Sequence, residues 1–249
     1  MSIRNLGQIV LTAVIAFGFA GTAFADGHEE GYPISVSERP LTLDEGQMKV
    51  DASFGVSAFG DFMADSLNIG VSYGVMENLT VGANIAPLSL GLMDSEFGYG
   101  DPSIGALYRF MHGDLEVAGG VDIGIPVEGS LDVTVMIPVA YHMDALRLGT
   151  GLHVTLIGLD ADVSTIIALP VEVGYNVTGD MHVSLQTGIM GNVDNFGDSL
   201  TIPVGVGLGY TVADGDAPMV DIGLGFSLPN VENTDMWAVG LTGNFHLWL

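Results

Sequence analysis

The sequence predicts an all-β fold, a transmembrane antiparallel up-and-down β-barrel of 12 strands, from three observations. Aromatic residues recur at intervals of 33 to 35 residues, at Tyr73, Tyr108, Tyr141, Tyr175, Tyr210 and Phe245. Apolar residues alternate with small or polar residues inside each interval, which is the pattern of a strand with one apolar face. Short stretches rich in Asn, Asp and Gly follow the tyrosines. Each interval therefore corresponds to one β-hairpin, and the repeat counts the hairpins.

A repeat of two helices per unit is the competing explanation for a period of this length. Within residues 131–141, however, every odd-numbered position is apolar, whereas a helix face needs apolar residues three and four positions apart. The 36 glycines of the chain also disfavour long helices. Strands are therefore predicted.

The first residues have the pattern of an export signal. Arg4 precedes an apolar stretch over 9–20, and the small-x-small sequence Ala-Phe-Ala ends at Ala25. This pattern predicts a signal peptide over 1–25. The alternative is an N-terminal membrane anchor, which needs about 20 apolar residues and is disfavoured by the glycines before the cleavage site. The predicted organisation is a signal peptide (1–25), an N-terminal periplasmic segment (26–47) and a transmembrane barrel (48–249).

The composition fits a barrel in the bacterial outer membrane of a Gram-negative cell. The chain is 48% apolar and only 14% charged, with a mean hydropathy of +0.47, yet no apolar run after residue 25 is long enough for a helical span. It has no cysteine, so stability is expected from barrel closure and packing. The expected partners are outer-membrane lipid and lipopolysaccharide, the barrel-assembly machinery and small-molecule solutes.

The part of the chain after the signal peptide is strongly acidic. All 30 Asp and Glu residues lie there, against four basic residues, Arg39, Lys49, Arg109 and Arg147. This excludes nucleic acid as a partner, because nucleic-acid binding requires clustered Lys and Arg. Two explanations of the acidity stay open: a lumen that favours cations, and an acidic surface adapted to a saline habitat or to solubility.

The strands follow from the alternation and the turn residues. They are predicted at 48–59, 66–76, 79–87, 102–111, 115–127, 131–142, 146–157, 162–176, 181–190, 201–212, 217–227 and 236–249. One set of connections is short and rich in Asn, Asp and Gly, as tight hairpins require, and the alternate set is longer on average. Short periplasmic turns and longer outer loops are the asymmetry typical of outer-membrane barrels.

The recurring aromatic residues are predicted to form a membrane girdle. Tyr73, Tyr108, Tyr141, Tyr175 and Tyr210 all precede a short turn by a few residues, and they and Phe245 share the parity of the apolar, lipid-facing positions. An aromatic ring at that depth keeps its body in lipid and its polar edge among headgroups. The last strand carries the same outward face up to Leu249, which resembles the C-terminal assembly signal of outer-membrane barrels.

The opposite parity gives the lumen, where many residues are small, such as Gly205, Gly207 and Gly209. Small side chains cannot fill a cylinder of twelve strands, since eight strands already make one just wide enough to fill. The lumen is therefore a channel, either fully open or narrowed by segment 26–47 as a lumen plug. Four prolines with inward parity, at 126, 138, 170 and 203, predict local bulges.

Charged and histidine side chains with inward parity are the predicted pore-lining residues. They are Lys49, Asp51, Arg109, Glu116, Asp122, Asp132, His142, Arg147, His153, Asp162, Glu172, His182 and Asp221. Most of those near the short turns are predicted to form either an ion-pair network that braces the barrel or a selectivity ring. Asp122, Asp132, Asp162 and Asp221 are predicted to lie higher, away from basic residues, and to attract cations.

Enzymatic and metal-binding patterns are weak. His182 and Ser184 have the His-x-Ser spacing of outer-membrane phospholipases, but the sequence continues Leu185-Gln186 in place of that family's Asn-Gly, and no third catalytic partner is evident. Acidic loop residues do not match a calcium-loop spacing. No catalytic residue, metal site or cofactor is predicted, and the protein is not expected to be an enzyme.

Three stretches resemble a porin-like family of outer-membrane β-barrels named for the meta-pathway of phenol degradation. They read ERPLTL at 38–43, YGVMENLTVG at 73–82 and GDPSIGALYRF at 100–110. The resemblance implies an outer-membrane channel for small, often hydrophobic or aromatic compounds. The predicted function is therefore passive diffusion of small solutes through an acidic, cation-favouring lumen. The alternative is a closed structural barrel whose acidic loops contact lipopolysaccharide through divalent cations, or contact other partners.

Overall fold

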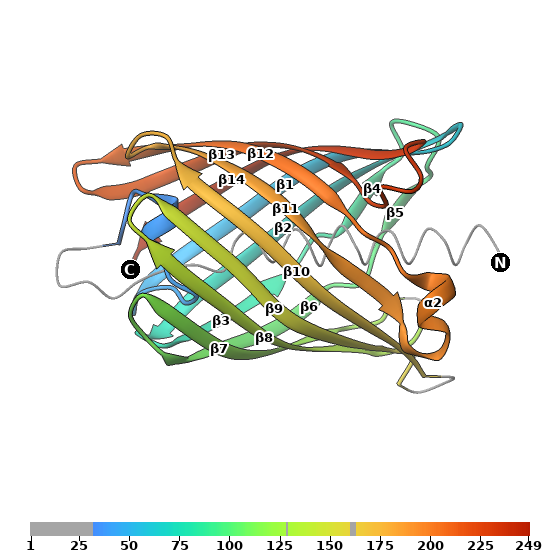
Figure 1. The fold of residues 1–249 in the computed structure, drawn as a ribbon, viewed down its shortest axis with the longest axis horizontal. Helices are drawn as coiled ribbons and strands as arrows, with labels where there is room; N and C mark the ends of the chain where they lie inside the picture. Colours follow the sequence, from blue (N-terminus) through green and yellow to red (C-terminus); the bar gives the residue numbers. More distant parts are fainter. Residues whose placement is uncertain (1–31, 128, 160–162) are drawn as a thin grey trace.

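The computed structural model describes residues 32–127, 129–159 and 163–249, and in this part of the chain twelve antiparallel strands close into a barrel (Figure 1). The strands are β1 (Gln47–Phe59), β2 (Phe62–Met76), β3 (Leu79–Asn84), β6 (Ser103–Met111), β7 (Leu115–Gly124), β8 (Asp132–Met143), β9 (Leu146–Ile157), β10 (Ser164–Asn176), β11 (Met181–Asn192), β12 (Val204–Asp214), β13 (Ala217–Leu228) and β14 (Met236–Trp248). Successive strands pair with each other, and β14 pairs with β1 to close the ring. The predicted fold class is confirmed.

The two ends of the barrel differ in their connections. Tight turns join β2 to β3, β6 to β7, β8 to β9, β10 to β11 and β12 to β13, and we call this the turn end. The opposite end, here called the loop end, carries the longer connections (right in Figure 1). One connection at the loop end is shorter than predicted, because β1 and β2 continue to a turn at Gly60 and Asp61.

Two connections at the loop end contain secondary structure that periodicity did not predict. The connection between β3 and β6 folds into the hairpin β4 (Leu88–Leu90) and β5 (Phe97–Tyr99), which extends the sheet at Leu67 of β2. The carboxylate of Asp65 fastens this connection by accepting bonds from the backbone N–H groups of Leu90, Leu92 and Met93 at 2.9–3.0 Å. Between β11 and β12 lie the short helices η2 (Val193–Asn195) and α2 (Phe196–Ser199).

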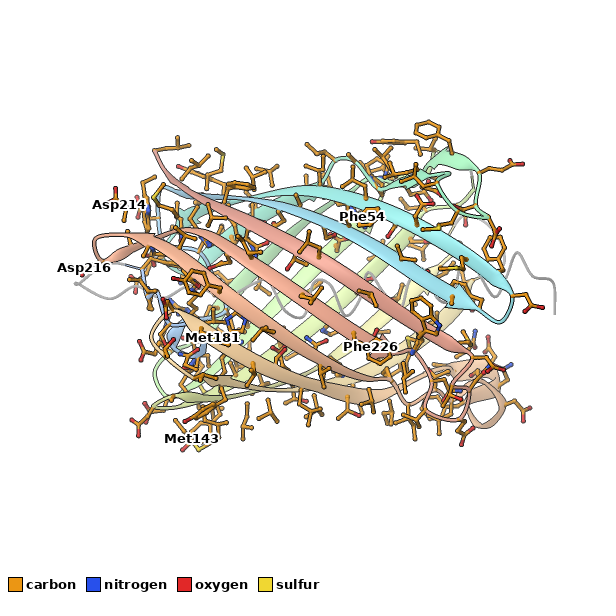
Figure 2. The ribbon with its side chains drawn as sticks, turned by 90° about the horizontal axis from the view of Figure 1, so that it is seen from above. Phe54, Met143, Met181, Asp214, Asp216 and Phe226 are labelled. Carbon is orange, nitrogen blue, oxygen red and sulfur yellow. The ribbon has the colours of Figure 1, made fainter. Side chains whose placement is uncertain are left out.

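The outer face of the barrel is apolar. Val206, Leu208 and Leu224 are 53%, 46% and 54% exposed, and similar residues cover the outside of every wall strand (Figure 2). An exposed apolar surface of this extent is typical of the outer face of outer-membrane barrels. No helix in the described ranges has the length and hydropathy of a membrane span.

The six aromatic residues of the repeat belong to this exposed face. Their exposed fractions lie between 36% for Tyr73 and 49% for Tyr175. The hydroxyl of Tyr108 also accepts a 3.0 Å bond from the side chain of Asn78, in the tight turn between β2 and β3. The structure thus places these rings near the turn end, and their contact with lipid headgroups stays a prediction.

The prediction of bulges at four prolines is wrong. Residues 126 and 203 lie outside the strands, and the register shifts occur between Gly74 and Met76, Arg109 and Met111, and Val212 and Ala213. The other two prolines keep the register because a glycine lies opposite each of them, in the pairs Pro138–Gly151 and Pro170–Gly188. A Cβ at Gly151 would approach the Cα of Pro138 to 3.0 Å, so the pair depends on the missing side chain.

Candidate functional site

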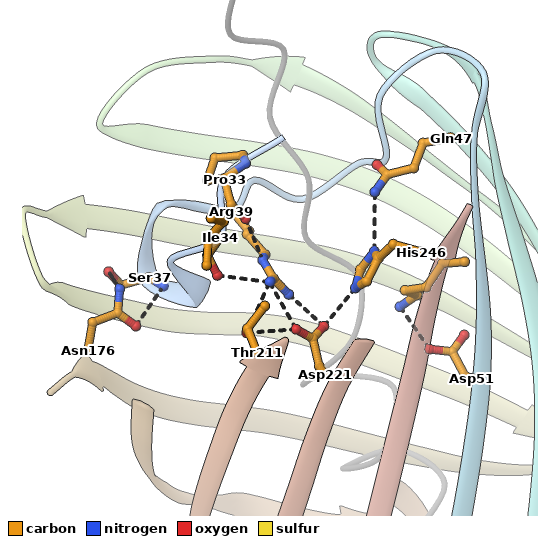
Figure 3. Close-up of polar contacts among 11 residues, drawn as sticks. Pro33, Ile34, Ser37, Arg39, Gln47, Asp51, Asn176, Thr211, Asp221 and His246 are labelled. Atoms are coloured by element: carbon orange, nitrogen blue, oxygen red, sulfur yellow. Dashed lines mark hydrogen bonds and ion pairs between the residues drawn. The ribbon is translucent and has the colours of Figure 1, made fainter. Parts of the chain in front are cut away.

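The described residues before β1, 32–46, lie inside the turn end of the barrel (Figure 3). We call residues 32–46 the N-terminal segment; it includes the single 3-10 turn η1 (Val36–Glu38). Its side chains are buried against the inner wall, with exposed fractions of 1–2% for Tyr32, Leu41 and Leu43. The segment therefore occupies the lumen at this end.

A bidentate ion pair joins the N-terminal segment to the wall. The guanidinium of Arg39 donates to both carboxylate oxygens of Asp221 on β13, at 2.7 and 2.9 Å. Thr211 on β12 donates to the same carboxylate at 2.7 Å, and Nε2 of His246 on β14 lies 2.7 Å from it. Because the Arg39 and Asp221 side chains are 5% and 9% exposed, this is a buried charge pair with its remaining bonds satisfied.

The other groups of Arg39 bond to its own segment. Its guanidinium donates to the carbonyls of Pro33 and Ile34, both at 2.9 Å, and lies 5.3 Å from the ring centroid of Tyr32. Burial raises the pKa of the Tyr32 phenol well above its usual value, so the ring stays neutral beside the cation. Arg39 thus fixes both the fold of the segment and its attachment.

A second ion pair holds the middle of the segment. Arg109 on β6 donates to Glu116 on β7 at 2.8 Å, and both side chains are 1% exposed. The other oxygen of Glu116 accepts the backbone N–H of Leu41 at 2.9 Å. The backbone N–H of Leu43 donates in turn to the hydroxyl of Thr80 on β3 at 2.7 Å. The segment is therefore bonded to strands on opposite sides of the barrel.

The helical turn η1 has its own contacts. The amide of Asn176 on β10 donates to the hydroxyls of Ser35 and Ser37, and the latter bond is 2.6 Å long. Nδ1 of His142 on β8 lies 2.6 Å from the carbonyl oxygen of Ser37. Strands β8 and β10 therefore also bind the N-terminal segment.

The four basic residues of the described chain are buried at the turn end. Arg39, Lys49, Arg109 and Arg147 are at most 4% exposed. Lys49 pairs with Asp51 at 3.0 Å, and the charge of Arg147 interacts with those of Glu172 and Glu116. The outer surface of the described chain consequently carries no Lys or Arg, and its acids are not balanced there.

A cavity of about 120 Å³ lies above the N-terminal segment in the lumen. Leu41 of the segment belongs to one apolar cluster with Leu107 of the wall, Met136 packs against this cluster, and all three line the cavity. Most of the lining is apolar or small, and the polar exceptions include Asn84, Asp122, His153 and Glu172. A concave apolar site with a few polar groups is typical of small-molecule binding.

The structure divides the predicted pore-lining residues between these two regions. Lys49, Asp51, Arg109, Glu116, His142, Arg147 and Asp221 lie at the turn end, whereas Asp122, His153 and Glu172 line the cavity. Asp132 accepts the N–H of Gly158 at the loop end, and His182 packs over Gly209 on the neighbouring strand. Asp162 lies outside the described residues.

The predicted high position of Asp221, away from basic residues, is wrong. Its partner Arg39 is 182 positions away in the sequence, so no local pattern reveals the pair. Sequence reasoning also missed Tyr32, Thr211 and His246. The inward parity of His246, next to outward Phe245, was the available signal. Among the described residues, no three His, Cys, Asp or Glu residues are grouped so that they could hold a metal ion.

Comparison with known proteins reveals a shared fold at low sequence identity. No family model and no curated protein matches the chain, so the resemblance to the phenol meta-pathway family stays a prediction. Among solved structures, the chain is similar to the NanC porin (TM-score 0.61, 12% identity), covering 80% of this chain and 100% of the porin.

Two further solved structures are similar in the same way. An outer-membrane channel from Pseudomonas putida F1 has a TM-score of 0.61 at 13% identity, covering 83% of this chain and 97% of the channel. The KdgM porin has a TM-score of 0.56 at 9% identity, covering 79% and 98%. All three are described as porins or channels. At such identities the likeness shows a porin-like barrel fold.

Proposed function

We propose that the protein is a bacterial outer-membrane channel for passive diffusion of small solutes, with the N-terminal segment as a plug at the periplasmic, turn end. The observation that carries the proposal is the combination of an apolar outer face with a lumen that still contains a cavity of about 120 Å³. A barrel whose only role is structural has no need of an internal space, since a void forgoes packing contacts.

The plug determines how wide the pathway is. Its ion pairs and backbone bonds close much of the turn end, so the full chain is expected to conduct weakly and to pass only small solutes. The acids of the lumen favour cations over anions. Apolar lining residues such as Leu107 and Met136 support solutes with a hydrophobic or aromatic part.

Single-channel recording on the refolded chain tests this proposal. Small, cation-selective steps that grow when the plug is loosened by Arg39→Ala are the expected result. Addition of permeant solutes should produce brief blockades. A complete lack of steps in both the full chain and the variant would rule out a channel.

A closed structural barrel is the second candidate, and the tightly bonded plug favours it. In that case the unbalanced acids of the outer surface would contact lipopolysaccharide through divalent cations. Chelation of divalent cations would then weaken binding of the protein to lipopolysaccharide vesicles, and no variant of the plug would conduct.

A further inference from the structure

The lumen cavity has an apolar floor of the right scale for one small ring. Leu41, Leu107 and Met136 pack together beneath it, and its volume is about 120 Å³. A protein cavity of about 150 Å³ with an apolar lining is known to hold benzene. The floor therefore suits the apolar part of a small molecule.

Asn84 supplies a hydrogen-bond acceptor that the barrel itself does not use. It ends β3, is only 7% exposed and lines the cavity. Its side-chain oxygen Oδ1 is buried and accepts no hydrogen bond from the described residues. A buried acceptor without a protein donor carries a desolvation cost, which a ligand with a donor group would offset.

Asp122 on β7 adds a carboxylate to the same cavity, with only β6 between it and the strand of Asn84. Asn84 pairs across the sheet with Ser103, and the hydroxyl of Ser103 donates to Oδ2 of Asp122 at 3.2 Å. Gly105, directly opposite Asp122, makes room for that carboxylate, since a Cβ there would lie 2.8 Å from Oδ2. Among the described residues, the side-chain donor to Asp122 is the neutral hydroxyl of Ser103. The negative charge of Asp122 therefore faces the cavity without a basic partner.

The charge of the cavity lining favours a ligand whose hydrogen-bond donor group is positively charged. The cavity lining contains the carboxylates of Asp122 and Glu172 and no Lys or Arg, and Glu172 interacts with Arg147 below. An ammonium group satisfies both an amide oxygen and a carboxylate, whereas an anion would be repelled.

We propose that this cavity is a binding site for a small organic cation, with one apolar ring on Leu41, Leu107 and Met136 and an ammonium group held by Asn84 and Asp122. The proposal deepens the channel function, because it names the solute class that pauses in the lumen, and it rests on that function for its physiological meaning.

Calorimetric titration of the detergent-solubilised full chain tests the site with four matched probes. Benzylamine should bind; methylamine, which lacks the ring, and benzyl alcohol, which lacks the charge, should bind more weakly; benzoate should not bind. Asp122→Asn should weaken benzylamine binding about tenfold, the usual effect of losing one charge-assisted hydrogen bond. Asn84→Ala should also weaken it.

Asp132→Asn is the matched control, because it removes the same charge from the loop end, away from the cavity lining. Gly149→Leu fills the cavity while keeping both polar groups, and a Cβ there meets the Cβ of Glu172 at an ordinary 3.6 Å. It should abolish binding. A shift in gel mobility on heating shows that each variant is folded.

Equal binding of benzylamine and benzoate, or unchanged affinity in Asp122→Asn and Gly149→Leu, would overturn the site. Titration needs no conductance, so the two proposals fail separately. Benzylamine binding without single-channel steps would rule out the channel function and support the binding site. Single-channel steps without benzylamine binding would rule out only the binding site.

Discussion

The turn end and the cavity are two parts of one lumen, and the polar side chains most important to each have different partners. At the turn end, Asp221 and Glu116 have their oxygens bonded to Arg39, Arg109 and the backbone of Leu41. In the cavity, Asn84 keeps a buried acceptor that no described residue uses. The bonded carboxylates attach the N-terminal segment to the wall, whereas the free acceptor of Asn84 is the group that the proposed ligand would use.

The largest expected effect comes from removing the cation that fastens the plug. Arg39→Ala leaves the buried carboxylate of Asp221 without its arginine partner, and loss of one member of a buried ion pair costs about 3–5 kcal/mol. The N-terminal segment should then leave the lumen for much of the time. Single-channel conductance should rise severalfold, and protease should cleave the segment faster. Asp122→Asn, in the cavity, should leave protease resistance unchanged; equal resistance in Arg39→Ala would contradict the comparison.

A smaller effect is expected where the two regions meet. Leu41→Ala removes the side chain that packs in one cluster with Leu107 and Met136, and such a change costs about 2–5 kcal/mol for a buried leucine. The cavity should enlarge while the Arg39 pair persists. We expect a moderate rise in conductance, measured under the same salt conditions, with slower proteolysis than in Arg39→Ala. Proteolysis as fast as in that variant would mean that apolar packing, rather than charge, holds the plug.

The barrel wall beside the cavity should tolerate no added side chain opposite Pro138. Gly151→Ala places a Cβ 2.9 Å from the carbonyl oxygen of Ile137, and overpacking of this kind costs about 1–3 kcal/mol. The midpoint of urea unfolding in lipid vesicles should fall. Gly174→Ala is the matched control, because a Cβ there meets nothing within 4 Å. Equal midpoints for the two variants would show that the proline–glycine pair is not strained by a methyl group.

The smallest effect concerns ion selectivity. Removing one carboxylate changes the free energy of a passing ion by about 1 kcal/mol or less in a water-filled lumen. Asp122→Asn should therefore lower the ratio of cation to anion permeability by roughly twofold. Reversal potentials in a salt gradient measure this ratio. An unchanged ratio in both Asp122→Asn and Asp132→Asn would remove lumen charge as the origin of selectivity.

Strand count and facing could be predicted because both depend on local patterns. The alternation along 131–141 and the turn residues after Tyr141 are both local in the sequence. They predict the strands and the turn that the barrel contains. Strand ends were less predictable. The hairpin β4–β5 was missed because its three-residue strands are too short for a period, and because Asp65, from another strand, organises it.

The candidate site was predictable only in part. Parity marked Asp122, His153 and Glu172 as inward, and they line the cavity. Parity could not assign partners, since it gives a direction and no distance. Asp221 was consequently placed high in the lumen and away from cations, although it bonds Arg39.

By itself, the sequence determined a twelve-stranded barrel with an apolar outside, a lumen of small residues and a strongly acidic charge. These properties follow from the two-residue period of strands, from turn chemistry and from composition. Only the tertiary structure decided that the four basic residues are buried at the turn end, and that Asn84 and Asp122 share a cavity above them. Barrel closure brings residues from distant strands together, and their contacts depend on strand tilt and register, which no local period records.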